Sequence, residues 1–166
     1  MYRQLGPAVV VTAEALRADV EALRLPARVV LNPEPERGMF SSVQVGVAAV
    51  QPACDLLFLT PVDCVLPDAA VPRLLLAAAA TGPAGTAWVP TCAGRRGHPL
   101  LLDRRAYRGL LAHPAAAVLS AVVASLRVVD VPVPEPRILL NINTPDDYSR
   151  LEAWGLRERY EGSPEH

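Results

Sequence analysis

The sequence has 166 residues, 51% of them hydrophobic and 20% charged, and its formal net charge is -1 at pH 7. This balance is typical of one globular domain, excludes a disordered chain, and gives no indication of nucleic acid or an anionic membrane as a partner. All 16 basic residues are arginines, so the chain has neither the phosphate-binding lysine of a P-loop nor a Schiff-base lysine.

The predicted elements alternate between short apolar runs, typical of buried strands, and longer amphipathic or alanine-rich segments, typical of helices. The run 127–133 alternates apolar and polar residues, which favours an edge strand. In chain order, the pattern predicts strand 8–12, helix 13–25, strand 27–31, helix 41–50, strand 55–60, helix 68–80, strands 86–90 and 99–102, helices 103–112 and 115–126, strands 127–133 and 138–142, and helix 144–154.

Several side chains support these helices. Leu16 and Leu23 fall on one face of the first, which predicts an amphipathic helix. Asp68 is a natural N-cap for the third. Thr144 and Asp147 form a capping box that accounts for the acidic start of the last helix without a catalytic role.

The alternation of strands and helices predicts a single α/β domain over residues 1–156 with a mostly parallel, doubly wound sheet, followed by a charged tail over residues 157–166. In such sheets, ligands bind beyond the carboxyl ends of the strands. The loops that follow the predicted strands are therefore where we expect a functional site.

The three cysteines, Cys54, Cys64 and Cys92, lie in apolar sequence without C-x-x-C spacing, which predicts buried free thiols rather than disulfides or a zinc site. The N-terminus has no signal-peptide pattern, and the apolar stretches are interrupted by Asp, Pro or His well before a membrane-spanning length. We therefore expect a cytoplasmic protein without a transmembrane helix.

Asp63 is the sharpest candidate, because it comes three residues after the predicted strand 55–60 in otherwise apolar sequence. A carboxylate there is desolvated unless a cation meets it. Mg2+ prefers oxygen ligands and usually takes one or two carboxylates plus substrate phosphates. Asp63 is thus a candidate magnesium ligand; the alternative is a turn aspartate that accepts hydrogen bonds from nearby backbone N–H groups.

Three other loops contain candidate ligand-binding residues, for which a purely structural role is the alternative. Gly38 and Ser42 lie in a glycine loop that runs into a helix, where phosphate or sugar oxygens can bind, although a serine can simply cap that helix. Gly97 and His98 follow two arginines and form either an anion-binding turn or a solvated hairpin. Asn143 leaves the same end of the sheet as Asp63 and could help to hold a metal-bound ligand.

Taken together and in order, these signals resemble the MobA-like NTP transferase family, which includes the molybdenum-cofactor guanylyl- and cytidylyltransferases. The resemblance runs from about residue 8 to about residue 154. It rests on Asn32, on Gly38-Met39 with Ser42 and Gly46, on Thr60-Pro61-Val62-Asp63, on Gly97-His98-Pro99, and on Asn141-Ile142-Asn143-Thr144-Pro145-Asp146-Asp147.

The resemblance implies a Rossmann-like, three-layer fold of the nucleotide-diphospho-sugar transferase type. It implies that a nucleoside triphosphate binds with Mg2+ and that a phosphorylated acceptor, typically molybdopterin, attacks its α-phosphorus. Asp63 would then be the magnesium ligand. The nucleotide would bind near Asn32, Gly38 and Ser42, and the acceptor or metal near Gly97, His98 and Asn143.

One departure limits what the resemblance implies. The family opens with a strand, a glycine-rich loop of the type L-A-A-G-x-S-x-R-M-G and a lysine, whereas Met1 to Leu5 matches the end of the family's first helix. We therefore expect an N-terminally truncated domain, with a second copy or a partner chain completing the sheet. Three hypotheses compete. The first is an active or formerly active transferase core whose missing segment is supplied by a partner chain or was lost through a wrong start. The others are a noncatalytic binding or assembly subunit and a related transferase that uses another acceptor.

Overall fold

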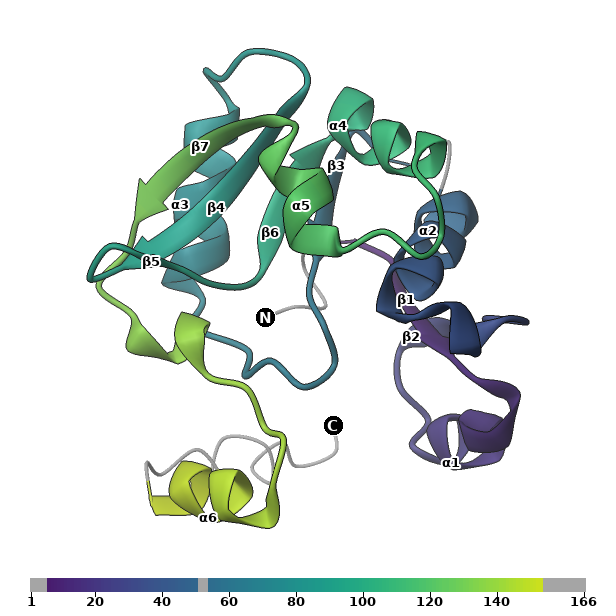
Figure 1. The fold of residues 1–166 in the computed structure, drawn as a ribbon. Helices are drawn as coiled ribbons and strands as arrows, with labels where there is room; N and C mark the ends of the chain where they lie inside the picture. The colour runs from purple at the N-terminus through teal and green to yellow at the C-terminus, as the bar shows by residue number, and fades with distance from the viewer. Residues whose placement is uncertain (1–5, 51–53, 154–166) are drawn as a thin grey trace.

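The structure, a computed structural model, describes residues 6–50 and 54–153, and its strands form two separate sheets (Figure 1). The smaller sheet pairs β1 with β2 in parallel, and the larger has five strands. The strands are β1 (Ala8–Thr12), β2 (Ala27–Leu31), β3 (Leu56–Leu59), β4 (Thr86–Cys92), β5 (Arg95–Arg96), β6 (Leu100–Asp103) and β7 (Arg127–Pro132).

Six α-helices and several short 3-10 helices connect the strands in the described part of the chain. Of these helices, none has the length and apolar character needed to cross a membrane. They are α1 (Arg17–Ala22), α2 (Met39–Val50), α3 (Ala70–Ala79), α4 (Arg104–Gly109), α5 (Leu119–Ala124) and α6 (Pro145–Ala153), with the 3-10 helices η2 (Glu14–Leu16), η3 (Pro35–Arg37), η4 (Leu110–Ala112) and η5 (Pro136–Leu139).

The expectation of a mostly parallel sheet is wrong. In the larger sheet β6 pairs antiparallel with both β3 and β4, β5 pairs antiparallel with β4, and only β7 runs parallel to its partner β4. The reason is the short connection between β4 and β6, because a parallel crossover needs a dozen or more residues. Because β6 runs antiparallel between β3 and β4, the strands β3, β4 and β7 run in the same direction. Their carboxyl ends therefore lie at the same edge of the larger sheet.

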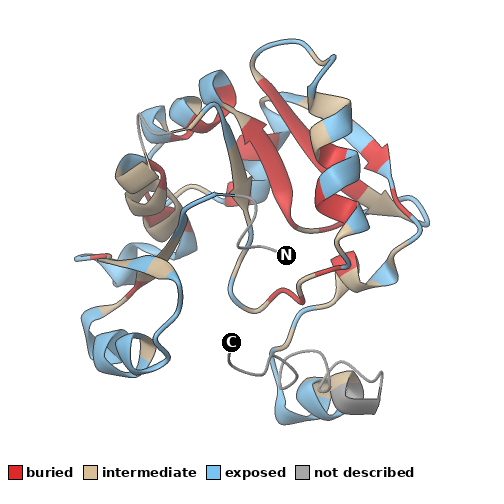
Figure 2. Cartoon of the chain, turned by 180° about the vertical axis from the view of Figure 1, so that it is seen from behind, coloured by how far each residue is buried: buried red, intermediate tan, exposed pale blue. Residues whose placement is uncertain are grey.

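Helices cover both faces of the larger sheet, which gives the expected three layers. On one face, Ala87 and Val89 of β4 pack with residues of α2, α4 and α5, and on the other Trp88 packs with α3. This alternation follows from the two-residue period of a strand. Figure 2 shows the buried residues gathered on these central strands.

The smaller sheet is joined to this core mainly through α2. Gly46 of α2 lies so close to β1 that a Cβ added there would sit 3.1 Å from Val11 Cγ2. Phe40 and Val47, on the same helix, are buried in the core of the larger sheet. One helix therefore packs against both sheets.

Two other expectations differ from the structure. The helix predicted over 13–25 is a 3-10 turn followed by the short α1, and Leu16 and Leu23 are 55% and 66% exposed rather than packed. The strand predicted over 138–142 is absent, because Glu135 and Pro136 begin the 3-10 helix η5. The last helix is described over Pro145–Ala153, and both its predicted last residue, 154, and the predicted tail 157–166 lie outside the described residues.

Asp103 ties the start of β4 to the start of α4. Its carboxylate accepts hydrogen bonds from the backbone N–H groups of Gly85 and Thr86, at 2.5 and 3.0 Å, and from that of Ala106, at 2.8 Å. The last of these bonds is the N-cap of α4. One side chain thus satisfies three backbone donors from two elements.

Replacing Asp103 with alanine should lower the free energy of unfolding by about 2–3 kcal/mol, because a cap is lost and two further N–H groups lose their acceptor. Urea denaturation measures this change. Asp55→Ala is the control: its side chain is 90% exposed and its ion pair with Arg104 is at the surface, so it should change stability by less than about 0.5 kcal/mol. Equal effects of the two substitutions would contradict this role of Asp103.

Candidate functional site

The segment of residues 138–142 brings together loops that are far apart in the sequence. The backbone N–H of His98 donates to the carbonyl of Ile138 at 2.9 Å, and that of Val65 donates to Leu140 at 3.0 Å. The N–H of Ile142 in turn donates to the carbonyl of Asp63 at 2.7 Å. The turn at His98 and the loop of Asp63 therefore lie against the same segment, at the carboxyl edge of β3 and β4.

Asp63 is half-buried in the loop that follows β3. Within the described residues it has no ion pair with an arginine or histidine. The next residue, Cys64, forms an isolated bridge with Asn141, and its thiol lies 3.9 Å from a carboxylate oxygen of Asp63. A partly desolvated carboxylate without a protein cation is suited to binding a metal ion.

The thiol of Cys64 is a structural group at this edge. Burial, with a smaller contribution from the Asp63 carboxylate, raises the pKa of the thiol to about 11. It is therefore protonated at neutral pH and donates to the side-chain oxygen of Asn141 at 3.4 Å. This contact holds the Asp63 loop against the segment that leads to Asn143.

The position of Gly97 has no room for a side chain. A Cβ built on it would lie 2.2 Å from the carbonyl oxygen of Ile138, closer than any real contact. Its own N–H donates to the carbonyl of Pro90 at 2.9 Å, which fixes the turn against β4. This close approach places the next residue, His98, beside the Asp63 loop.

The imidazole of His98 is neutral at neutral pH. Burial lowers its pKa, and the nearby Asp63 carboxylate opposes this shift without cancelling it. A neutral imidazole next to a carboxylate can offer a lone pair to a metal ion or a hydrogen bond to a substrate oxygen.

Asn143 lies at the exposed start of the last helix. Its backbone N–H donates to Asp147 at 3.1 Å, and Thr144 and Asp147 exchange the two hydrogen bonds of the expected capping box. The side-chain amide of Asn143 has no hydrogen-bond partner within the described part of the chain. It therefore stays available to a ligand near Asp63.

The second group of candidates surrounds the start of α2. Asn32 is buried, and its amide donates to the hydroxyls of Ser41 and Ser42 at 2.8 and 2.9 Å. Its carbonyl oxygen accepts from the N–H of Glu34 at 3.0 Å. Gly38 has a φ of 97°, in the region that favours glycine. Asn32 therefore shapes the loop, in which Gly38 is exposed and Ser42 is half-buried.

The two groups follow strands of different sheets. None of Asn32, Gly38 and Ser42 is hydrogen-bonded to Asp63, Gly97, His98 or Asn143. The described residues also contain no cluster of three or more His, Cys, Asp or Glu side chains that could hold a metal ion. A metal at Asp63 would therefore take most of its ligands from water and from substrate.

Two contacts, that of Cys64 with Asn141 and that of Arg96 with Asp130, were not predicted from the sequence. Cys64 was expected only as a buried thiol, and Asn141 only as part of a motif. Arg96, which the pattern offers as a charge for an anionic substrate, pairs instead with Asp130, at 2.7 and 3.1 Å. Only the register of β4, β5 and β7 brings Arg96 and Asp130 together, so spacing along the chain does not reveal the pair.

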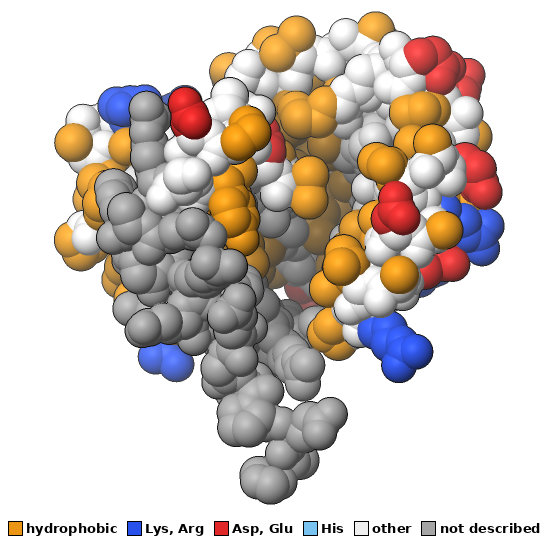
Figure 3. Space-filling model, turned by 90° about the horizontal axis from the view of Figure 1, so that it is seen from below, with side chains coloured by type: hydrophobic (Ala, Val, Ile, Leu, Met, Phe, Trp, Pro, Cys, Tyr) orange, Lys and Arg blue, Asp and Glu red, His pale blue; other side chains and the backbone are white. Residues whose placement is uncertain are grey.

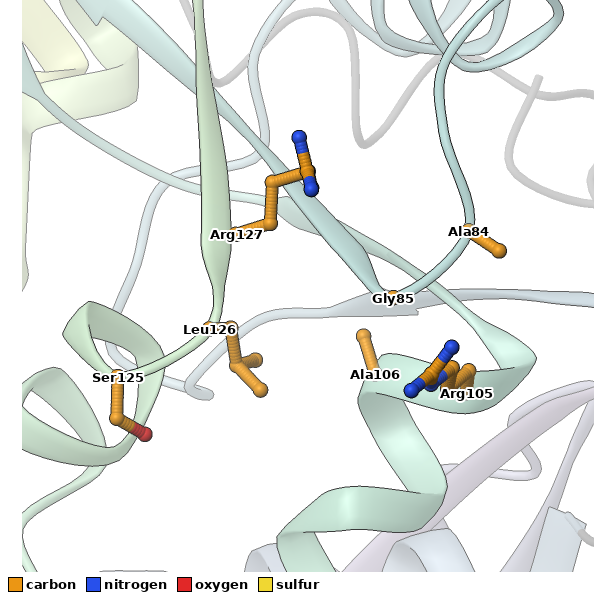
Figure 4. Close-up of a pocket in the computed structure, with 7 residues that line it drawn as sticks. All are labelled: Ala84, Gly85, Arg105, Ala106, Ser125, Leu126 and Arg127. Carbon is orange, nitrogen blue, oxygen red and sulfur yellow. The ribbon is translucent and has the colours of Figure 1, made fainter.

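A surface pocket lies at the opposite, amino ends of β4 and β7 (Figure 4). Its lining includes Gly85, Arg105, Ser125 and Arg127. It contains none of the candidate residues, so it does not contribute to the site described above.

Comparisons with known proteins identify a sequence family and solved structures of similar fold. A sequence model of the MobA-like NTP transferase domain matches residues 1–131. Comparison with curated proteins gives no match. Solved structures of similar fold include molybdopterin-guanine dinucleotide biosynthesis protein A from Archaeoglobus fulgidus, with 19% identity, a TM-score of 0.65, and coverage of 90% of this chain and 78% of that one.

Two further structures share the fold. A nucleotidyl transferase from Methanothermobacter is 23% identical, with a TM-score of 0.69, and the match covers 91% of this chain and 74% of that one. Rv0371c from Mycobacterium tuberculosis, solved in complex with manganese, is 23% identical, with a TM-score of 0.70 and coverage of 90% and 80%.

Replacing Gly97 with alanine should lower the free energy of unfolding by about 1–3 kcal/mol, because the added methyl group collides with a backbone carbonyl. Thermal or urea unfolding measures the change. Gly109→Ala is the matched control, since an added Cβ meets nothing within 4 Å and alanine favours the helix α4. A destabilisation by Gly109→Ala as large as that by Gly97→Ala would show that the close approach at Gly97 is not what matters.

Proposed function

Because the chain belongs to the MobA-like NTP transferase family, we propose that it transfers a nucleoside monophosphate from a nucleoside triphosphate to a phosphorylated acceptor. The observation that carries the proposal is the meeting of the Asp63 loop, the Gly97-His98 turn and the Asn141–Asn143 segment at one sheet edge. Ligands of α/β sheets bind at such an edge.

Asp63 is the proposed ligand of a divalent metal ion, with Mg2+ as the expected ion. Its carboxylate is half-buried and has no cationic partner among the described side chains. The manganese complex of Rv0371c, a protein of similar fold, is in keeping with a divalent ion. Such an ion neutralises the charge that develops on the phosphates during transfer.

The nucleotide is proposed to contact the loop that Asn32 organises. Gly38 precedes the N-terminus of the 12-residue helix α2, and Ser42 lies in its first turn. Free backbone N–H groups and a hydroxyl at such a terminus bind phosphate or ribose oxygens. Asn32 acts on the nucleotide through the loop, since its own amide is bonded to Ser41 and Ser42.

The acceptor is proposed to lie by Gly97, His98 and Asn143, and its class is a phosphorylated small molecule such as molybdopterin. A phosphate oxygen of the acceptor would form a bond to the α-phosphorus, and the bond from that phosphorus to the β-phosphate oxygen would break, releasing pyrophosphate. Neutral His98 and the Asn143 amide can orient the acceptor without adding charge. Both substrates are metabolites of the cytoplasm, where we propose that the protein acts.

The separation of the two candidate groups favours a second function. Asn32 follows β2 of the smaller sheet, and Gly38 and Ser42 lie at the start of α2 after it, whereas Asp63 and His98 follow β3 and β5 of the larger sheet. A chain in which these groups do not act together would be a noncatalytic binding or assembly subunit that keeps the fold. Tight NTP binding that depends on Asp63 distinguishes the catalytic function from this alternative.

Replacing Asp63 with asparagine should reduce metal-dependent release of pyrophosphate from an NTP by about 100-fold or more, because the isosteric amide keeps the shape but loses the charge. The assay measures pyrophosphate with Mg2+ or Mn2+, each of the common NTPs, and molybdopterin as acceptor. Asp146→Asn is the matched control: Asp146 is exposed at the start of α6 and should leave the rate unchanged.

Calorimetry on the same variants tests binding separately. The proposal expects an NTP with Mn2+ to bind the native chain and Asp146→Asn alike, and Asp63→Asn more weakly. The noncatalytic alternative is the better account if no NTP binds to the native chain, or if the NTP binds Asp63→Asn as tightly as the native chain.

A further inference from the structure

The pocket at the amino ends of β4 and β7 has a lining that the proposed transfer reaction does not use. Its volume is about 330 Å³, which lies at the lower end of the range for small-molecule sites. The lining comes from the turn before β4, from the helix α4, and from the junction between α5 and β7. These segments are far apart in the sequence, so only the fold assembles the pocket.

Two arginines give the pocket its charge. Arg105 comes from α4 and Arg127 is the first residue of β7, and Figure 4 shows them on either side of Gly85. Neither arginine has an ion pair or a side-chain hydrogen bond with a residue that the structure describes. One free arginine is ordinary at a protein surface. Two that line the same concavity can both contact a single anion.

No carboxylate in the described part of the chain is paired with these two arginines. The acidic side chain next to the pocket is that of Asp103, which accepts from the backbone N–H groups of two lining residues, Gly85 and Ala106, at 2.5 and 2.8 Å. It also accepts from the N–H of Thr86 at 3.0 Å. Both oxygens of Asp103 are therefore bonded to backbone donors, and the guanidinium groups stay available to a ligand.

Both arginines start from well-anchored backbone. Tyr107, two residues after Arg105, is fully buried in the core, and Arg127 pairs with the fully buried Thr86. Gly85 has a φ of 80°, and a Cβ added to it would lie 3.5 Å from Cδ of Arg105, so this side chain passes close over Gly85. Groups that are already positioned lose less entropy when a ligand binds.

The rest of the lining is small and mostly apolar. Ala84, Ala106 and Leu126 contribute hydrocarbon groups, and the hydroxyl of Ser125 donates to the carbonyl of Val122 at 2.7 Å. This part of the lining suits the carbon skeleton of a ligand. On the face seen from below, by contrast, hydrophobic side chains line the hollow and the visible basic side chains stand at separate places near the margin (Figure 3).

We propose that this pocket binds a small organic phosphate, with the phosphate group between Arg105 and Arg127 and the carbon skeleton against the apolar lining. A phosphomonoester carries nearly two negative charges at neutral pH. Two guanidinium groups match that charge, and each offers a planar pair of donors. The small volume favours a skeleton the size of a sugar over that of a nucleotide.

This inference does not rest on the proposed function. The pocket lies at the amino ends of β4 and β7, whereas Asp63 lies at the edge formed by the carboxyl ends of the strands. The ligand would therefore occupy a second site, away from the proposed metal ion.

A titration of the full chain with glucose 6-phosphate, followed through backbone amide NMR signals, tests the proposal. The signals of Ala84, Gly85, Ala106 and Leu126 should move together and give a Kd of about 1 mM or lower. Glucose should leave these signals unchanged, because it lacks the phosphate. Absence of the shifts with glucose 6-phosphate, or equal shifts with glucose, overturns the proposal.

Two further probes test the size of the ligand. Inorganic phosphate and AMP should each bind at least threefold more weakly than glucose 6-phosphate, because the first has no carbon skeleton and the second has one that is too large. Equal or tighter binding of inorganic phosphate would mean that the apolar lining contributes nothing. Equal or tighter binding of AMP would mean that a nucleotide is the ligand. Either result contradicts a site for a sugar-sized phosphate.

Substitutions of exposed arginines test the contacts. Arg105→Gln and Arg127→Gln should each raise the Kd of glucose 6-phosphate at least tenfold, because each removes a charge-assisted pair of hydrogen bonds. Arg108→Gln is the matched control, since Arg108 is exposed on the same helix as Arg105 but does not line the pocket. It should change the Kd less than twofold. Equal weakening by all three would indicate a diffuse effect of charge and overturn the proposed contacts.

An added carboxylate tests the charge of the pocket without removing either arginine. Ala84 is exposed at the rim, so Ala84→Glu should raise the Kd at least tenfold, whereas the neutral Ala84→Gln should stay within threefold of the native chain. Equal Kd values for these two variants contradict the proposal. Asp63→Asn should bind glucose 6-phosphate as the native chain does, which separates a failure of this pocket from a failure of the proposed transfer reaction.

Discussion

Three backbone hydrogen bonds that involve residues 138–142 hold together the loops of the candidate site. They attach the turn at His98 and the loop of Asp63 to one segment that then continues to Asn143. The pattern depends on the segment not being a regular strand, since a strand would direct its groups to one or two neighbouring strands instead of to two separate loops. The thiol of Cys64 and the close approach at Gly97 reinforce the same arrangement. The chemistry that we assign to Asp63 follows from this attachment.

Some polar residues near the candidate site stabilise the fold and do not contact a ligand directly. Asn32 uses its amide to hold Ser41 and Ser42, and Asp147 caps the last helix. At the carboxyl edge of the larger sheet, the groups that remain for a ligand are the Asp63 carboxylate, the neutral imidazole of His98 and the amide of Asn143. Three groups with one negative charge are suited to a metal-bound phosphate substrate, where the metal and the phosphates supply the other ligands.

Much of this arrangement could be predicted from the sequence, because local patterns determine it. The runs at 8–12 and 27–31 are strands with the predicted bounds, Trp88 is in the core, and the capping box of Thr144 and Asp147 forms. The direction of β6 was missed, although the short connection before it already forbids a parallel crossover. The apolar run at 138–142 resembles a strand, and only contacts with distant loops show otherwise. Leu16 and Leu23 are exposed, and the predicted helix is reduced to the six residues of α1, which include neither leucine.

The central claim is that a divalent metal ion and an NTP meet at Asp63. Paramagnetic broadening of amide signals by Mn2+, measured on the full chain with an NTP present, tests it most directly. The account predicts strongest broadening at Asp63, Cys64, His98 and Asn143, and its loss in Asp63→Asn. Broadening centred elsewhere, or unchanged in that variant, would contradict the account.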